Sequence, residues 1–488
     1  MKDALIIYNT ISRKKEKFEP LNDPFVGMYV CGPTVYSDVH LGNCRTFVSF
    51  DLIYRYLLHV GYKVRYVRNI TDAGHLEGDR DEGDDKFSKK ARLEQLEPME
   101  IVQRYTVGFH DVLKMFNTLP PSIEPTATGH ISEQIEMIKE IIGNGYAYEV
   151  NGTVYFDVEK YSKENNYTIL TNRNLEEMLN NTRDLGGQDE KKGRLDFALW
   201  IKAKPEHIMR WPSPWSVGFP GWHIECSAMS NKYLGSQFDI HGGGMDLAAT
   251  HHTNEIAQSQ ACNHTNPAKY WMHTNMLTVN GARMSKSAGN GFLPHELFSG
   301  EHPLLERGYS PMSVRFFMLQ AHYRSTLDFS NEALDAAEKG YKRLMNAMLL
   351  LPDLQPSDKS NDFKIDELRD RCYAAMNDDF NSPVLIAELF EGVRIINSVF
   401  DGKAFLNGTQ IEELKNLMEQ FVYDVLGLAD DTLDVKGDFE QIMKVIIELR
   451  NDAKANKDYV SSDRIRERLQ EIGIQLKDNK TKTHWVKA

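Results

Sequence analysis

A strand–helix–strand pattern between residues 25 and 70 constrains the fold of this chain more than any other feature. An apolar, β-branched run over Phe25 to Cys31 stops at Gly32-Pro33 and predicts a buried strand. Apolar residues at helical spacing over Thr46 to Val60 predict a helix, and Lys63 to Ile70 alternates like a second strand. These three elements form a βαβ unit, so the chain is predicted to be an α/β protein built on a parallel sheet.

The composition indicates a globular protein of several domains. At 488 residues the chain exceeds a single core, and 41% hydrophobic with 26% charged residues excludes wholesale disorder. No apolar run approaches the ~18–20 residues that span a bilayer, and the first residues, MKDALIIYNT, lack the features of a secretory signal. The five scattered cysteines fit a reducing compartment better than a disulfide framework. We therefore expect a cytoplasmic location with no membrane attachment.

The α/β pattern is interrupted in the middle of the chain and gives way to helices later. An amphipathic helix over Ser132 to Ile142 and a β-hairpin over Tyr146 to Phe156, with Asn151-Gly152 at its turn, indicate a separate subdomain. The α/β pattern resumes with a strand that enters Gly242-Gly243-Gly244, and helical periodicity dominates from Pro311 onward. We expect one sheet domain over residues 1–118 and 222–310, an insertion over 119–221, a helical bundle over 311–400 and a small C-terminal region over 401–488.

The charge balance changes sign within the C-terminal region. The whole chain has a net charge of -13, which argues against a surface covered with nucleic-acid-binding charge. Residues 401–440 carry 3 basic and 10 acidic side chains, whereas residues 441–488 carry 11 basic and 7 acidic ones. A basic end on an acidic chain indicates a local polyanion contact. A solvated helix face followed by a charged tail explains the same pattern equally well.

Two short segments could bind phosphate, although the sequence has neither a G-x-x-x-x-G-K-[ST] loop nor a G-x-G-x-x-G turn after a strand. His40-Leu41-Gly42-Asn43 stands just before the first long helix, where unpaired N–H groups and a partial positive charge favour anions. Arg283 to Ser287, flanked by glycines, indicates a mobile loop whose Lys286 could clamp a phosphate. Taken alone, an ordinary helix start and a solvated basic loop explain the two segments.

Four dispersed residues have the chemistry of a mixed metal site. Cys31 ends the first predicted strand, Cys226 lies in GWHIECSAM, and His251 and Glu255 are four residues apart in HHTNE. Four-residue spacing places two side chains on one face of a helix. Two cysteines, one histidine and one glutamate form a plausible tetrahedral zinc set. A buried cysteine and a surface histidine–glutamate contact are the alternatives that spacing alone leaves open.

Longer stretches around these residues resemble one protein family. The two phosphate-binding candidates, in this order, resemble the His-Ile-Gly-His and Lys-Met-Ser-Lys-Ser elements of the class I aminoacyl-tRNA synthetases. Within that class, the cysteinyl-tRNA synthetases are similar to this chain in MYVCGPTVY, YVRNITD, FPGWHIECSAM, FDIHGGGMDL and HHTNEIAQS. The resemblance implies a Rossmann-like catalytic sheet with a mobile Met-Ser-Lys-Ser loop, a connective insertion, a helical bundle and an anticodon-binding C-terminal region.

The resemblance also implies roles for individual residues. The zinc ligands of the family match Cys31, Cys226, His251 and Glu255. Two positions of the cysteine pocket match Thr71 and Trp222. The nucleotide-binding and catalytic positions match His40, Gly42, Asn43, His241, Asp246 and Lys286.

The chain departs from the family pattern at a few positions. Asn43 replaces the final histidine of the first element, and Arg283 replaces the first lysine of the second. Thr253 stands where a glutamate is expected, and Ala249-Thr250 where a Phe-Pro pair is expected. Because all four zinc-ligand positions are intact, we expect these departures to affect the rate rather than the type of reaction.

The activity implied by the resemblance is a cysteine–tRNA ligase. Such an enzyme activates L-cysteine with ATP, which carries magnesium, and then transfers the cysteinyl group to the 3′ end of tRNA(Cys). The resemblance further implies one zinc per chain and a monomer. At the basic end, arginines could contact RNA phosphates and an aromatic ring could stack on an unpaired base. The residues predicted for this role are Arg464, Arg466, Arg468 and Trp485.

Three other functions are alternatives to the cysteine–tRNA ligase hypothesis. A ligase that hands cysteine to a small amino sugar would need no long RNA-reading tail, yet about 200 residues follow the loop element. A non-catalytic tRNA-binding paralogue would be favoured by loss of His40 or Lys286, and both are present. A zinc hydrolase is disfavoured because the sequence contains no H-E-x-x-H element.

Overall fold

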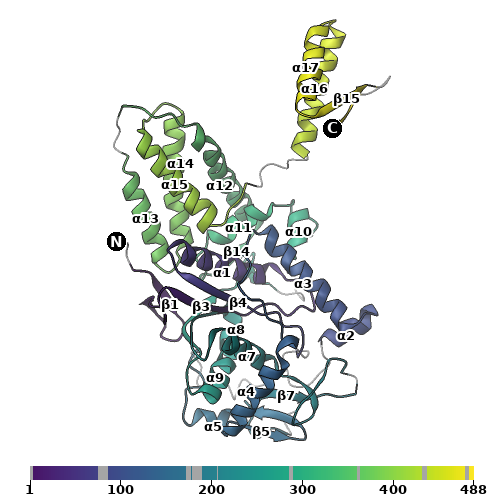
Figure 1. Ribbon diagram of the computed structural model, residues 1–488, viewed down its shortest axis with the longest axis vertical. Helices are drawn as coiled ribbons and strands as arrows, with labels where there is room; N and C mark the ends of the chain where they lie inside the picture. The colour runs from purple at the N-terminus through teal and green to yellow at the C-terminus, as the bar shows by residue number, and fades with distance from the viewer. Residues whose placement is uncertain are drawn as a thin grey trace. The chain divides into compact units, whose positions relative to one another are not determined.

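The computed structural model describes residues 4–74, 86–171, 177, 190–205, 207–284, 289–359, 363–430, 437–478 and 483–487. These residues form two compact units, Met1–Ala429 and Asp430–Ala488, each with its own internal packing. The first unit contains a parallel sheet, an inserted antiparallel sheet and a set of helices (Figure 1).

A four-stranded parallel sheet organises the first unit. Its strands are β3 (Phe25–Val30), β4 (Lys63–Arg68), β10 (Phe238–Gly244) and β11 (Ala268–Thr274), in the order β11-β10-β3-β4. Every neighbouring pair is parallel, and helix α1 (Leu41–His59) connects β3 to β4. The predicted βαβ unit and parallel sheet are therefore confirmed. Gly242 lies under this helix, because a Cβ at that position would stand 2.2 Å from the ring of Phe50.

Helix α1 begins earlier than its apolar spacing predicts. The ring of His40 accepts a hydrogen bond from the backbone N–H of Asn43 at 3.3 Å, and the Asn43 side chain accepts one from the N–H of His40 at 3.2 Å. This reciprocal pair is a capping box, which satisfies N–H groups that a helix start leaves without partners. The segment His40-Leu41-Gly42-Asn43 therefore forms the first turn of α1 rather than a loop before it.

The insertion carries a second, antiparallel sheet. Its strands run in the order β5-β6-β7-β9-β8, and β5 (Ala147–Val150) and β6 (Thr153–Phe156) form the predicted hairpin. The two turn residues, Asn151 and Gly152, have φ of 53° and 90°, which is the conformation that Asn-Gly turns favour. Helix α4 (Ile131–Gly143) confirms the predicted amphipathic helix. The other strands are β7 (Phe197–Lys202), β8 (Trp211–Pro212) and β9 (Val217–Pro220).

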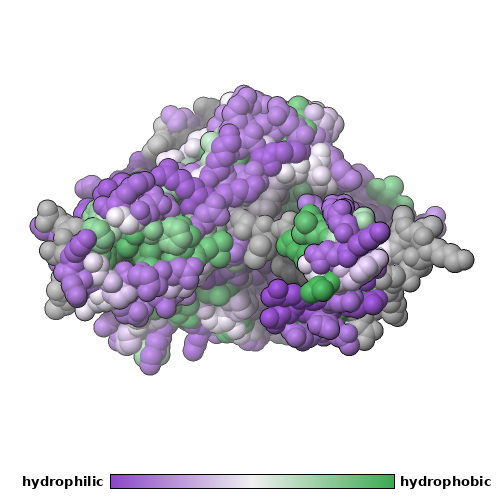
Figure 2. Space-filling view, turned by 90° about the horizontal axis from the view of Figure 1, so that it is seen from above, coloured by the Kyte–Doolittle hydropathy of each residue, from purple (hydrophilic) through white to green (hydrophobic). Residues whose placement is uncertain are grey.

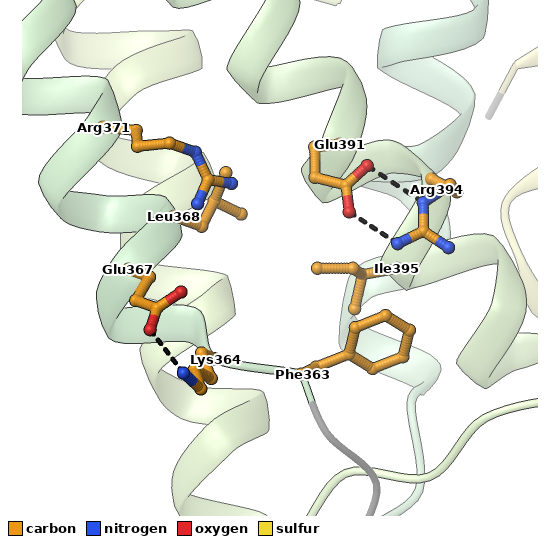
Figure 3. A pocket seen from close by; sticks show the side chains of 8 residues that line it. All are labelled: Phe363, Lys364, Glu367, Leu368, Arg371, Glu391, Arg394 and Ile395. Atoms are coloured by element: carbon orange, nitrogen blue, oxygen red, sulfur yellow. Dashed lines mark hydrogen bonds and ion pairs between the residues drawn. The ribbon is translucent and has the colours of Figure 1, made fainter.

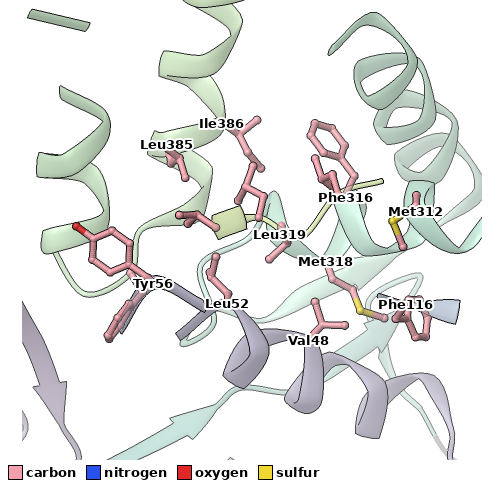
Figure 4. Packing of buried hydrophobic residues seen from close by; sticks show 14 of the residues in the cluster. Val48, Leu52, Tyr56, Phe116, Met312, Phe316, Met318, Leu319, Leu385 and Ile386 are labelled. Carbon is pink, nitrogen blue, oxygen red and sulfur yellow. The ribbon is translucent and has the colours of Figure 1, made fainter. Parts of the chain in front are cut away.

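Helices pack directly on α1 and extend the core away from the sheet. Figure 4 shows Val48 and Leu52 of α1 beside Leu319 of α11 (Pro311–Leu319), with Leu385 of α14 (Ser382–Phe400) nearby. The bundle continues past residue 400 through α15 (Gly408–Glu419) and the π-helical turn η5 (Gln420–Val425), both of which belong to the first unit. The other helices of this region are α12 (Asn331–Leu350) and α13 (Ile365–Asn377).

A buried ion cluster ties α1 to this helical region. Asp51 accepts hydrogen bonds from Arg55 at 2.8 Å and from Arg315 at 2.5 Å through one carboxylate oxygen, Oδ2. Its Oδ1 accepts the backbone N–H of Leu119 at 2.7 Å. The guanidinium of Arg315 is fully buried and also donates to the carbonyls of Phe116 and Leu426. The carboxylate of Asp51 therefore accepts hydrogen bonds from two buried guanidinium groups and from the loop at Leu119.

The second unit is a small α/β element with its own core. Helices α16 (Gly437–Ala455) and α17 (Tyr459–Glu471) precede the antiparallel strands β15 (Ile474–Asp478) and β16 (Thr483–Lys487). Met443, Leu469, Ile474 and Leu476 form the buried cluster.

The surface in Figure 2 is mainly hydrophilic, with hydrophobic residues in separate patches. Among the described residues, no helix is both long and apolar enough to cross a membrane.

Apart from the helices of the candidate site, which are described below, the first unit contains further helices and short strands. They are β1 (Ile6–Asn9), β2 (Lys14–Lys17), α2 (Lys86–Glu94), α3 (Pro98–Met115), η1 (Thr128–His130), α5 (Val158–Ser162), β12 (Leu277–Val279), β13 (Ala282–Arg283), α10 (Pro294–Ser299), β14 (Leu327–Phe329) and η4 (Leu351–Asp353).

Candidate active site

The structure brings the four predicted metal ligands together. Cys31 directly follows β3, and Cys226 lies on α7 (Trp222–Leu234). His251 belongs to the π-helical turn η3 (Ala248–His252), which follows α8 (Met245–Leu247), and Glu255 lies on α9 (Thr253–Asn263). One donor atom from each residue lies within 4.8 Å of the other three, and all four side chains are buried. Elements that are far apart in the sequence thus meet at the carboxyl ends of β3 and β10.

The distances within this cluster suit a single ion. The two sulfur atoms of Cys31 and Cys226 are 3.8 Å apart, and Cys226 Sγ is 3.4 Å from His251 Nε2. Glu255 Oε1 is 3.6 Å from Cys31 Sγ and 3.3 Å from His251 Nε2. The opposite ring nitrogen of His251 lies 2.9 Å from Nδ1 of His223. That contact fixes the orientation of the imidazole and turns Nε2 toward the other donors.

A second set of donors shares two members with the first. Cys31 and Glu255 also meet His241 and His252, with His252 Nε2 3.4 Å from Cys31 Sγ and His241 Nε2 2.8 Å from Glu255 Oε2. His252 in turn contacts His273 at 2.8 Å. Sequence reasoning did not single out His252, His273 or His223. The adjacent histidines His251 and His252 in HHTNE were the one sequence signal for these extra donors, but helical spacing does not show which of the two histidines faces the site.

The electrostatics of the cluster favour a bound cation. Burial raises the pKa of the Cys31 thiol well above its ordinary value, and the neighbouring Cys226 and Glu255 raise it further. Burial likewise raises the pKa of Cys226 and lowers that of His273 to about 3, so this imidazole stays neutral. Thiolate, neutral imidazole and carboxylate donors in a dry site fit Zn²⁺, whose charge would compensate the anionic ligands.

The two residues predicted for the cysteine pocket flank this cluster. The indole of Trp222 packs on the ring of His251, with the centroids 4.4 Å apart. Thr71 is buried at the end of β4 and donates a hydrogen bond of 2.9 Å from its hydroxyl to Oε2 of Glu225. Burial raises the pKa of the Glu225 carboxyl well above its ordinary value, the hydrogen bond from Thr71 opposes that rise, and the nearby Asp72 adds to it.

Only part of the predicted nucleotide region falls within the described residues. Gly42 faces the loop element, because a Cβ there would lie 3.1 Å from both the ring of His40 and the methyl group of Met284. Lys286 itself lies outside the described residues. His241 is fully buried against Glu255, on the metal side of the site, whereas Asp246 is exposed on α8.

A pocket of about 490 Å³ lies elsewhere, between α13 and α14 (Figure 3). The three cations that line it are already paired: Lys364 with Glu367 at 2.6 Å, Arg371 with Glu388 at 2.8 Å, and Arg394 with Glu391 at 2.5 Å. The potential metal ligands therefore lie at the carboxyl ends of β3 and β10 and not in this pocket.

Comparisons with known proteins agree with this geometry. The family model "tRNA synthetases class I (C) catalytic domain" matches residues 17–339, and a DALR domain matches residues 371–430. A curated cysteine–tRNA ligase from Porphyromonas gingivalis is 56% identical over 488 residues, and one from Phocaeicola vulgatus is 57% identical over 489 residues. Each alignment covers 99% of both chains.

The chain belongs to the cysteine–tRNA ligase family. Its expected α/β fold is confirmed by solved structures of distant class I synthetases. A putative arginyl-tRNA synthetase from Campylobacter jejuni has a TM-score of 0.53 at 13% identity and covers 84% of this chain and 94% of its own. A methionyl-tRNA synthetase from Mycobacterium tuberculosis has a TM-score of 0.55 at 12% identity, with 82% and 89% covered.

The RNA contacts predicted for this member of the cysteine–tRNA ligase family all lie in the second unit. Arg464, Arg466 and Arg468 are exposed on α17, and Arg468 pairs with Glu471 at 3.0 Å. Arg464 and Arg468 are four residues apart and share a helix face, which Arg466 does not. Trp485 lies on β16 opposite Leu476 and packs against the small core of that unit.

Proposed function

We propose that this chain ligates L-cysteine to tRNA(Cys) in two steps that use ATP; the curated relatives are named cysteine–tRNA ligases. The observation that carries this proposal is the buried set of Cys31, Cys226, His251 and Glu255 beside Thr71 and Trp222. In the first step an oxygen of the cysteine carboxylate attacks the α-phosphorus of ATP, and pyrophosphate leaves. In the second step a ribose hydroxyl at the 3′ end of the tRNA attacks the carbonyl carbon, and AMP leaves.

The residues near the two phosphate-binding elements would serve the first step. In-line phosphoryl chemistry depends on positioning and charge stabilisation more than on a protein nucleophile. His40 and Asn43, with the first turn of α1, would orient the phosphates, and Lys286 would stabilise charge that develops on the leaving pyrophosphate. Magnesium would arrive with ATP. The carboxamide of Asn43 can still donate a hydrogen bond, although it cannot become cationic.

The proposed metal site would select cysteine over other amino acids. Zinc bound at Cys31, Cys226, His251 and Glu255 would bind the thiolate of the substrate. The hydroxyl of serine is less acidic than a thiol, so at neutral pH it would not lose its proton and bind in the same way. Trp222 would close the pocket over the substrate side chain. If the metal selects cysteine in this way, the insertion over residues 119–221 need not hydrolyse wrongly activated amino acids.

ATP–pyrophosphate exchange tests the function directly. We expect exchange with L-cysteine and none above background with L-serine, followed by charging of tRNA(Cys). Replacement of the tRNA by small amino sugars should give no acyl product. Exchange without tRNA charging, or transfer to an amino sugar instead, would contradict the proposal.

We expect the second unit to be needed for tRNA recognition and not for cysteine activation. It has its own core and carries the basic end of the chain. Truncation after Ala429 should leave pyrophosphate exchange within about twofold of the full chain. Losing base stacking and phosphate contacts should lower kcat/KM for charging about 10- to 100-fold. Charging at the full-chain rate would contradict an RNA role for Arg464, Arg466, Arg468 and Trp485.

We further propose that the protein acts in the cytoplasm as a monomer. The basis is the family resemblance together with the scattered, reduced cysteines. Light scattering at low micromolar concentration should give the mass of one chain, 56.0 kDa.

A further inference from the structure

A directed chain of hydrogen bonds ends at Glu225, next to the proposed metal ligand Cys226. The backbone N–H of Gly32 donates to Oδ1 of Asn69 at 2.9 Å, which fixes the orientation of that amide. Nδ2 of Asn69 then donates to the hydroxyl of Thr71 at 3.1 Å, and this hydroxyl donates to Oε2 of Glu225 at 2.9 Å. The hydroxyl proton of Thr71 is thereby committed to Glu225. What Thr71 can still offer a ligand is an acceptor lone pair.

The carboxyl of Glu225 is buried, and none of the cations that the structure describes pairs with it. Its side chain has no exposed surface, and its second oxygen, Oε1, has no hydrogen-bond partner within the described part of the chain. A buried carboxylate oxygen without a partner costs free energy, so such an atom beside the proposed cysteine-pocket residues Thr71 and Trp222 points to a group that arrives with the ligand. Gly74 adjoins the same oxygen, since a Cβ there would lie 3.1 Å from Oε1. The absence of a side chain at residue 74 keeps Oε1 uncrowded.

Asp72, a second buried carboxyl close to Glu225, has a hydrogen-bond donor for each of its two oxygens. Asp72 is as deeply buried as Glu225, yet its Oδ1 accepts the backbone N–H of Thr128 at 2.8 Å and its Oδ2 accepts the Thr128 hydroxyl. Asp72 therefore has a structural role within the fold. It also places a second acidic group near Glu225, which makes the surroundings receptive to a cation.

We infer that Thr71 and Glu225 form the receptor for the α-ammonium group of the amino-acid substrate. This inference rests on the proposed function, which supplies an α-amino acid whose thiol and ammonium groups are on adjacent carbons. Cys226 and Glu225 are consecutive on α7, and Trp222 precedes Glu225 by one helical turn. The thiol would face Cys226 and the other metal ligands while the ammonium faces Thr71 and Glu225. The arriving cation donates to Thr71 and supplies a counter-charge for Glu225, which no described cation provides.

Two thiols that differ in the ammonium group test this assignment. L-Cysteine and 3-mercaptopropionate share the thiol and the carboxylate, but 3-mercaptopropionate has no amine. We expect calorimetry on the zinc-loaded full chain to give at least about tenfold tighter binding of cysteine, because a charge-assisted hydrogen bond is worth about that factor. In Glu225→Gln the affinity for cysteine should fall about 10- to 100-fold. The affinity for 3-mercaptopropionate should stay within about twofold.

Control variants separate the possible outcomes. Asp72→Asn should keep the native ratio of the two affinities, and Thr71→Val, which keeps the β-branched shape, should lower that ratio as Glu225→Gln does. Metal content should equal that of the native chain in all three variants. If Glu225→Gln and Thr71→Val weaken both thiols equally, or leave the ratio unchanged, the inference is wrong. If the native chain binds neither cysteine nor 3-mercaptopropionate, the proposed function itself fails.

Discussion

Replacing Cys226 by alanine is expected to remove the bound metal and to lower kcat/KM for cysteine activation at least about 100-fold. Loss of a group that merely orients a metal ligand costs about 10- to 100-fold, so loss of a ligand should cost no less. The vacancy would also leave Cys31, His251 and Glu255 buried around an incomplete site. Metal analysis of the purified chain and pyrophosphate exchange with cysteine measure the two effects.

The matched control is another cysteine of the same chain. Cys262 lies near the end of α9, outside both donor sets, and is only partly buried. Cys262→Ser should retain about one zinc per chain and native exchange activity. In a cobalt-substituted enzyme, cysteine and not serine should produce a sulfur-to-metal charge-transfer band. If cysteine gives no such band while serine is still rejected, the metal does not select the substrate.

Asp51→Asn is expected to destabilise the first unit by about 3–5 kcal/mol. The substitution removes the anion that serves Arg55 and Arg315, and breaking a buried ion pair leaves an uncompensated charge. Burial already lowers the pKa of the fully buried Arg315, and the carboxylate of Asp51 opposes that shift. Thermal unfolding followed by circular dichroism should show a clearly lower midpoint.

An exposed ion pair provides the comparison for Asp51. Lys403 and Asp401 are 2.7 Å apart, but their side chains are 75% and 50% exposed. Asp401→Asn should change stability by no more than about 1 kcal/mol. Equal unfolding midpoints for Asp51→Asn and Asp401→Asn would contradict the role assigned to the buried cluster.

Local patterns predicted the sheet and its first crossover because those features depend on neighbouring residues. They failed where a distant side chain intervenes. The sequence from Tyr270 to Val279 is strand-like and by itself predicts one strand, but the structure divides it into β11 and β12, which belong to different sheets. At the division, the buried guanidinium of Arg45 on α1 binds the carbonyls of Asn275 and Met276. Nothing in the run itself indicates that an arginine 230 residues away will end the strand.

The site was predictable in its chemistry and less so in its geometry. Cys31, Cys226, His251 and Glu255 converge as the family resemblance implies. The four-residue spacing of His251 and Glu255 assumes a regular α-helix, whereas the chain forms a π-helical turn through His252. That turn brings both adjacent histidines toward Cys31 and Glu255, and it creates the second donor set. The role inferred for Glu225 depends on an unsatisfied oxygen, which no sequence pattern reports.

The long separation of the four proposed metal ligands has a consequence for the growing polypeptide. Cys31 and Glu255 are 224 residues apart. At synthesis rates of about 5–20 residues per second, the ribosome adds Glu255 roughly 11 to 45 seconds after Cys31. During that interval Cys31 is a thiol without its partners, open to oxidation or to capture by any passing soft metal ion. Of the four donors, Cys31 is therefore the one that waits longest for the set to be complete, and Glu255 is the last to be synthesised.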